Sequence, residues 1–393
     1  MPRFAVTESG EYVLARLPYF RLRYEKARTP ALGAFGTSRG NLISSMPKGS
    51  QVYSASNALF YAHHEGGTLE VYCVLPEAWA YVKVIEMLID SGVYHIQFFD
   101  GKIRVLTVHS DGQKNVLSWT DFKNPYSQLK RLPNVTGSVF EFPAKKLLTG
   151  RIELTSVPPS TKTAISCMYK DRLLLHRSRE THNYSRNNLE RQSLLSFVEC
   201  YDLSQSKLVW VSDEFEEHPG VTPPRAVLSG SDTTGIVSRF SELVLCNLST
   251  GDLIDAGRIA SGTGESGIPL VLADGHFLYS TERTHSSIMN GELSGYEVSV
   301  VKAQNRKVVA SLNTEFCFHK RIAVRETETI CLAGTSEAIT HVVSISRDTW
   351  RVLWKLDLEW ALKPQRVHFC INGQVLFVTS GFSYRLVELP QED

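Results

Sequence analysis

The feature that most constrains the fold of this chain is a pattern that recurs along its length. Each copy consists of two apolar, strand-like runs separated by a short polar turn. A clear copy is VYHIQFFDGKIRVLTV, which starts at Val93 and turns at Asp100-Gly101. Asp-Gly is typical of a two-residue β-hairpin, because both turn positions need positive φ. Six clear copies and one degenerate copy turn near Asn57, Asp100, Asp171, Asp232, Asp274, Glu326 and Asn372.

Most copies are followed by a second hairpin, such as LLSFVECYDLSQSKLVWVSDEF or THVVSISRDTWRVLWKLDL. Two hairpins supply four antiparallel strands, and the turns lie roughly 40 to 70 residues apart. Repeated four-stranded units of this length are typical of the blades of a β-propeller, because one twisted sheet cannot bury both faces alone. The sequence therefore predicts an all-β, seven-bladed β-propeller, with six or eight blades as alternatives.

The two ends of the chain suggest how such a ring closes. The last unit supplies three strands, and EYVLARL (11–17) is a lone strand near the N-terminus. We expect this N-terminal strand to complete the last blade and leave no edge unpaired. Residues 1–393 then form a single propeller domain, with residues 18–50 as an irregular connection. Residues 76–92 fit a helix or a strand, and the blade pattern favours a strand with Tyr81, Lys83, Ile85 and Met87 on one face.

The chain resembles the WD-repeat and quinoprotein-like β-propeller superfamily. The segments KLVWVSD (207–213) and RVLWKLD (351–357) are similar to the Trp-bearing outer strand of quinoprotein-type repeats. The resemblance is one of pattern: there is no Trp-Asp dipeptide, and Gly275-His276 is the sole Gly-His. It implies the propeller fold and carries no activity with it.

Composition predicts an intracellular protein, cytoplasmic or nuclear. The net charge is +1, so no overall field steers the chain to nucleic acid or to an anionic membrane. No signal-peptide pattern or long apolar span is present in the sequence. The seven cysteines are scattered and never form CxxC, which predicts neither a disulfide framework nor a zinc site. We expect no cofactor and no membrane partner.

Three short motifs match catalytic or nucleotide-binding patterns but lack the surroundings that the chemistry requires. Gly262, Gly264 and Gly267 spell GxGxxG, yet Pro269 and a predicted hairpin follow where a helix should begin. GTSRG places Ser38 in a GxSxG pattern without a buried strand before it. Ser45 and Lys48 match S-x-x-K, but a proline interrupts the helical turn. We interpret all three as loops.

Two charged clusters are interpreted as surface features. In His63-His64-Glu65, neighbouring strand residues point to opposite faces, so the two histidines are not expected to share a metal. The run SDEFEEHPG (212–220) is interpreted as a solvated face, or as a docking surface for a basic partner.

The most informative departure from the repeat is YKDRLLLHRSRETHNYSRNNLERQS, which lengthens the third unit between its second and third strands. Arginine with an interleaved aromatic suits a protein interface, and also phosphate contact and base stacking. A plain solvated hairpin extension is the third interpretation. The candidate binding residues are Arg177, Arg179, Tyr184, Arg186 and Arg191.

The sequence thus favours a non-enzymatic scaffold or adaptor that presents loops to protein partners. One alternative is an accessory subunit of an RNA-modifying or RNA-binding complex that uses the arginine stretch. The other is an enzyme with a small-molecule site in the propeller channel. No motif keeps the context that catalysis needs, so we predict no catalytic, cofactor-binding or metal residue.

Overall fold

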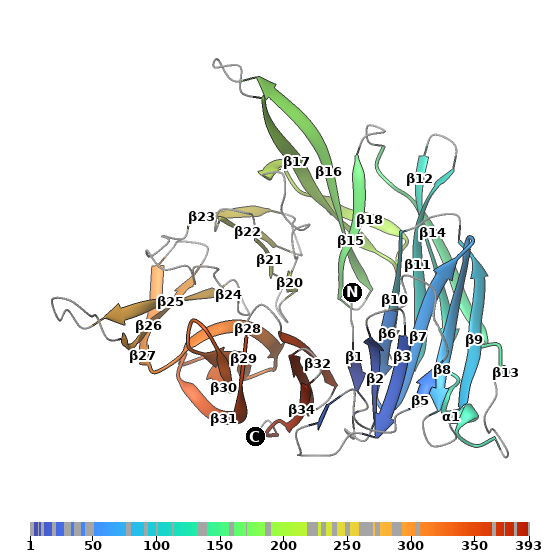
Figure 1. Cartoon of the computed structure of the whole chain (residues 1–393). Helices are drawn as coiled ribbons and strands as arrows, with labels where there is room; N and C mark the ends of the chain where they lie inside the picture. The colour runs from blue at the N-terminus through green and yellow to red at the C-terminus, as the bar shows by residue number, and fades with distance from the viewer. Residues whose placement is uncertain are drawn as a thin grey trace. The chain divides into compact units, whose positions relative to one another are not determined.

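A computed structural model of the chain is shown in Figure 1. The described residues are 4–6, 8, 12–17, 21–26, 33–34, 41–43, 51–75, 80–89, 93–99, 101–111, 114–132, 140–156, 161–169, 171–184, 190–217, 227–228, 233–237, 242–247, 252–258, 270–271, 276–284, 293–302, 307–363, 367–372, 374–380 and 383–391. These residues are nearly all β-strand, and their one helix is the single turn α1 (Tyr126–Leu129). The chain divides into two compact units, residues 1–155 with 365–393 and residues 156–364. We describe each unit separately.

The first unit contains four sheets, which we number in chain order together with those of the second unit. Sheet 1 consists of β1 (Phe4–Val6), β2 (Tyr12–Leu17), β3 (Arg21–Lys26) and β5 (Asn41–Ile43). Sheet 2 consists of β6 (Gln51–Ala55), β7 (Ala58–Glu65), β8 (Thr68–Leu75), β9 (Ala80–Leu88) and β13 (Phe140–Glu141). Sheet 3 consists of β10 (Val93–Phe99), β11 (Lys102–Asp111), β12 (Lys114–Lys123) and β14 (Lys146–Glu153). Sheet 8 consists of β32 (Val367–Asn372), β33 (Val375–Ser380), β34 (Ser383–Glu388) and β4 (Gly33–Ala34).

The second unit contains the other four sheets, all antiparallel. Sheet 4 consists of β15 (Lys162–Tyr169), β16 (Arg172–Tyr184), β17 (Glu190–Asp202), β18 (Lys207–Val211) and β19 (Phe215–Glu217). Sheet 5 consists of β20 (Val227–Leu228), β21 (Thr233–Val237), β22 (Glu242–Asn247) and β23 (Leu253–Arg258). Sheet 6 consists of β24 (Leu270–Val271), β25 (His276–Thr284), β26 (Leu293–Lys302) and β27 (Lys307–Thr314). Sheet 7 consists of β28 (Cys317–Val324), β29 (Glu328–Gly334), β30 (Ile339–Ser346) and β31 (Val352–Leu362).

The described residues thus form eight sheets, one more than the preferred count of seven and equal to one of the alternatives. Each of the seven turns read from the sequence separates the first two strands of a sheet, and Gly101 has the positive φ of 68° that its Asp-Gly turn requires. The additional sheet is sheet 1, formed before the first of those turns. Two of its four strands, β1 and β5, have only three residues each, too few to show the alternation from which the other units were predicted.

The strand that joins the last sheet is a different one from the strand predicted. β2 pairs with β1 and β3 inside sheet 1, and the outer position of sheet 8 is taken by β4. Only three residues separate β2 from β3, so this local hairpin closes a far shorter loop than a pairing with the C-terminal strands. Residues 18–50, expected to be an irregular connection, contain β3, β4 and β5.

Sheet 2 buries apolar side chains on both of its faces. One face supplies Leu59, Tyr61 and Val74 to a core cluster that includes Ala5 and Leu14 of sheet 1. The other face supplies residues such as Phe60 and Cys73 to a cluster shared with β10 and β11 of sheet 3. In the second unit, a comparable cluster joins sheets 6 and 7. These three pairs of sheets therefore pack face to face, as the repeat pattern requires of neighbouring units.

The outer strands share a local irregularity. In six sheets the pairing between the third and the outer strand shifts by one extra residue on the outer strand, and in five of these the unpaired residue is Val84, Leu147, Val209, Val309 or Leu353. A β-bulge bends a strand and interrupts its pattern of hydrogen-bonding groups, which hinders pairing with another chain. These outer edges also carry several of the exposed apolar side chains among the described residues, including Leu148 and Leu353 at 54% and 52% exposure.

Candidate functional site

The lengthened third unit is a long two-stranded hairpin, as the sequence predicted. β16 and β17 each have 13 residues and pair without interruption from Arg172↔Asp202 to Tyr184↔Glu190. β15 pairs with β16 as far as Ser178, so β16 continues six residues beyond that neighbour. Figure 1 shows this extension as the long green ribbon of the second unit.

Arg177 lies inside sheet 4 rather than on its surface. Its Nε is 2.9 Å from Glu199 Oε2, its Nη1 donates to Thr163 Oγ1 at 3.1 Å, and both charged side chains are 0% exposed. The Tyr201 hydroxyl donates to the same Glu199 oxygen at 3.1 Å. A side chain without exposed surface is not available to a partner, so Arg177 is corrected from a binding residue to a residue that holds the base of the hairpin together.

Arg179 lies two residues further along the same strand and reaches the surface. Its Nη2 contacts both carboxylate oxygens of Glu214, at 2.9 and 3.2 Å, with the two side chains 35% and 45% exposed. Glu214 belongs to the acidic run SDEFEEHPG. The three residues that follow Glu214 within this run form β19, which pairs with β17. The structure therefore joins two stretches that the sequence presented as separate candidates, and each partly neutralises the other.

The remaining hairpin candidates are placed by backbone register. Tyr184 pairs with Glu190 and Arg191 pairs with Asn183 at the end of the hairpin, while Arg186 lies outside the described residues.

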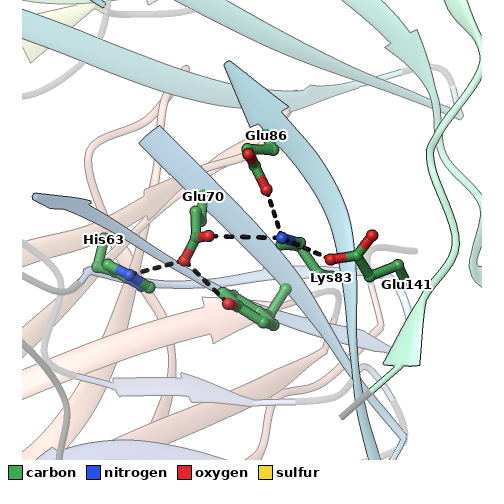
Figure 2. Close-up of polar contacts among 6 residues, drawn as sticks. His63, Glu70, Lys83, Glu86 and Glu141 are labelled. Carbon is green, nitrogen blue, oxygen red and sulfur yellow. Dashed lines mark hydrogen bonds and ion pairs between the residues drawn. The ribbon is translucent and has the colours of Figure 1, made fainter. Parts of the chain in front are cut away.

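A second group of polar residues lies on one face of sheet 2 in the first unit (Figure 2). Glu70 is at its centre: His63 Nε2 is 2.9 Å from Glu70 Oε2, and the Tyr72 hydroxyl donates to that oxygen at 2.9 Å. Lys83 Nζ is 3.6 Å from the other Glu70 oxygen. Lys83 also pairs with Glu86 and, at 2.7 Å, with Glu141 of β13.

Lys83 is thus surrounded by three carboxylates. Its hydrogen bond with Glu141, followed by that with Glu86, raises the pKa of Lys83 above its ordinary value. Burial, followed by the hydrogen bond to Glu70, raises the pKa of Tyr72. Three carboxylates, those of Glu70, Glu86 and Glu141, therefore face the single ammonium group of Lys83 (Figure 2).

The prediction that His63 and His64 point to opposite faces is confirmed. His63 stacks on Tyr72, and His64 meets the edge of Tyr94 in the neighbouring sheet. No group of three possible metal ligands occurs among the residues that the structure describes. The motifs around Ser38, Ser45 and Gly262 to Gly267 lie outside those residues.

The lysine cluster was not predicted from the sequence. Residues 76–92 do contain the expected strand β9, but Val84 is bulged. Tyr72 opposes Lys83 and Val71 opposes Ile85, so the bulge moves Ile85 and Met87 to the face opposite Lys83. The single-face alternation expected for Tyr81, Lys83, Ile85 and Met87 is therefore wrong. The partner Glu141 comes from a distant segment, which no local pattern indicates.

Comparison with known proteins gives structural likeness alone. No family model and no curated protein sequence matches the chain. Similar solved structures include the computationally designed Ika8 protein, which is 9% identical over 98% of this chain and 95% of that chain at a TM-score of 0.49. Sqt1 of Saccharomyces cerevisiae is 8% identical over 99% and 95%, at 0.45. BamB of Moraxella catarrhalis is 11% identical over 84% and 80%, at 0.38.

Every TM-score given above is below 0.5, so we base the fold on the sheets themselves. Within the described part of the chain, no helix is both long and apolar enough to span a membrane.

Proposed function

We propose that the eight sheets are the blades of a β-propeller that serves as a non-enzymatic scaffold for protein partners. Each sheet is a four-stranded unit of the kind that blades require, with β13 and β19 as additions. Sheet 2 packs against sheets 1 and 3, and β32 of the last sheet lies against β1 of the first. Asn372 Nδ2 also donates to the Ser56 carbonyl at 2.6 Å. Within the first unit, these contacts support sheets 8, 1, 2 and 3 as successive neighbouring blades.

The observation that carries the proposed role is the construction of the β16–β17 hairpin. Its base is fixed by a fully buried ion pair, and its outer part continues past β15 with the solvent-exposed Arg179–Glu214 pair on one face. A projecting ribbon on a fixed base presents side chains with little loss of freedom on binding, which favours association. Arginine and tyrosine are also the residue types that contribute most at protein interfaces.

We assign the proposed interface to Arg179, Tyr184, Arg186 and Arg191, with Arg177 excluded because it is buried. Glu214 already compensates the charge of Arg179, which leaves less positive charge for phosphate groups. This arrangement favours a protein partner with mixed charge over nucleic acid.

The test is a tagged purification of the full chain from native extract, read by quantitative mass spectrometry for protein and by sequencing for RNA. The interface variant changes Arg179, Arg186 and Arg191 to Ala. The matched control removes three positive charges elsewhere, by Lys146→Ala, Lys307→Ala and Lys363→Ala, all exposed positions. We expect protein partners to be lost from the interface variant and retained by the control. Recovery of RNA without stoichiometric protein, or equal recovery from both variants, contradicts the proposed interface.

A further inference from the structure

The chain leaves sheet 3 between β12 and β14 and runs along the outer edge of sheet 2. β13 pairs with β9 in parallel, with Phe140 opposite Val82 and Glu141 opposite Lys83. Two further backbone bonds continue the contact, from Phe142 N to Lys83 O at 2.9 Å and from Ala144 N to Val84 O at 2.8 Å. We call residues 140–144 the strap. The strap adds a fifth strand to sheet 2.

Among the described strands, the outer edge of β9 differs from the outer edges of the other sheets because another strand pairs with it. β14, β18, β27 and β31 each have a bulge near their start, and no strand pairs with their outer sides in the described part of the chain. β9 also has a bulge, at Val84, yet its outer side still accepts hydrogen bonds at Lys83 and Val84. The outer edge of β9 is therefore competent to bind an extended segment, and the chain itself supplies one.

The electrostatic cost of removing the strap is small. The Glu141 side chain is 70% exposed, so breaking its ion pair with Lys83 costs little free energy. Lys83 keeps Glu70 and Glu86 as partners when Glu141 leaves, so no charge is left buried without compensation. Lys123 N donates to Lys145 O at 2.8 Å, which holds the two ends of the excursion together at sheet 3. The strap can thus detach without opening that sheet.

The apolar contacts of the strap specify what must replace it. Ala144 is 9% exposed and Phe142 packs against the cluster shared by sheets 2 and 3, which also contains Val82 and Val84. A bare edge would expose this apolar surface. A replacing segment therefore needs an acidic residue beside Lys83, an apolar residue directly after it and a small residue two positions further on.

We propose that the outer edge of β9 is a strand-addition site that the chain fills with its own strap, and that an extended partner segment of this pattern displaces it. Main-chain hydrogen bonds give such a contact its affinity, and alternate side chains give it specificity. The inference rests on the proposed scaffold role, because it names one kind of partner that such a scaffold would bind. The proposed site belongs to the first unit, whereas the hairpin belongs to the second.

The first test uses the full chain with residues 140–144 replaced by Gly-Ser-Gly-Ser-Gly. The probe is a fluorescein-labelled peptide of residues 138–146, SVFEFPAKK, and binding is measured by fluorescence anisotropy. We expect the strap variant to bind the peptide roughly 10- to 100-fold more tightly than the native chain, whose site is mostly filled. Equal or absent binding to both proteins overturns the proposal.

A charge exchange tests the register. The peptide with Glu141→Lys should bind the strap variant more weakly, and adding Lys83→Glu to the strap variant should restore binding. Failure to restore it contradicts the assigned pairing of Glu141 with Lys83.

A second variant keeps the proposal testable if the strap variant does not fold. In the native chain, Lys83→Cys with Glu141→Cys places two thiols at paired register positions, so oxidation should lock the strap in place. Excess peptide should bind the reduced form and not the oxidised form. Binding to both forms overturns the edge site. These assays need no cellular partner, so their outcome is independent of the purification experiment on the hairpin.

Discussion

Two arginines on one strand, Arg177 and Arg179, have opposite surroundings. They lie two residues apart on the same face of β16, and each is paired with a glutamate from another strand or loop. The Arg177–Glu199 pair is 0% exposed on both sides, whereas the Arg179–Glu214 pair is 35% and 45% exposed. An arginine–glutamate ion pair therefore stabilises the interior of the sheet at Arg177 and lies on the protein surface at Arg179.

The difference follows from the neighbours of the hairpin. At Arg177 the hairpin is flanked by β15, which pairs Thr163 with Arg177. At Arg179 the pairing with β15 has ended, and the side chain meets water. Where a strand gains or loses its neighbour decides whether its charged residues are buried or exposed.

Breaking the buried pair should have the largest effect. Arg177→Ala leaves the Glu199 carboxylate buried without its cation, and we expect the free energy of unfolding to fall by about 3–5 kcal/mol. Urea titration followed by circular dichroism measures this loss. A loss below about 1 kcal/mol would mean that water reaches Glu199.

Lys83 of sheet 2 is 17% exposed, between the buried Arg177 and the exposed Arg179, and its contribution to stability can be tested by changing the pH. The pKa of Lys83 is raised from its ordinary value of 10.5 by its hydrogen bonds to Glu141 and Glu86. A raised pKa means that the stabilisation is fully present below pH 10.5 and is lost as pH rises through the folded-state value. We expect Lys83→Met to lower the melting temperature by a constant amount between pH 7 and 9, and by less above pH 10.5.

The control for this comparison is Lys363→Met, at an exposed position that belongs to the second unit. Its melting temperature should follow that of the wild type at every pH. If the difference in melting temperature between Lys83→Met and the wild type stays the same above pH 10.5, the effect comes from lost packing of the lysine stem and not from its charge.

The sequence predicted what depends on local pattern. The seven turns and the long hairpin follow from turn residues and strand alternation, and the β9 strand follows from the spacing of the repeat. Sheet 1 was not counted, because two of its four strands, β1 and β5, have only three residues each. The strand completing sheet 8 was misassigned, because β4 has only two residues.

The candidate sites were less predictable for a related reason. Arg177 and Arg179 are indistinguishable in sequence, since burial depends on where β15 ends. The bulge at Val84 moved Ile85 to the face opposite Lys83, and Glu141 reaches Lys83 from a segment 58 positions later (141 minus 83). Alternation along one strand contains no information on bulges or on pairing across such a distance.

Breaking the exposed pair should have the smallest effect, and it completes the comparison of the two arginines. We expect Arg179→Ala to change the free energy of unfolding by less than about 1 kcal/mol, because the ion pair is exposed to water. Arg179 Nε is also buried without a hydrogen-bond partner among the described residues, so truncation removes an unsatisfied group as well as an ion pair. The measurement is the same urea titration, repeated at low and at high salt. A loss comparable to that of Arg177→Ala would show that the outer hairpin belongs to the folded core, and the surface role would then have to move to residues nearer its tip.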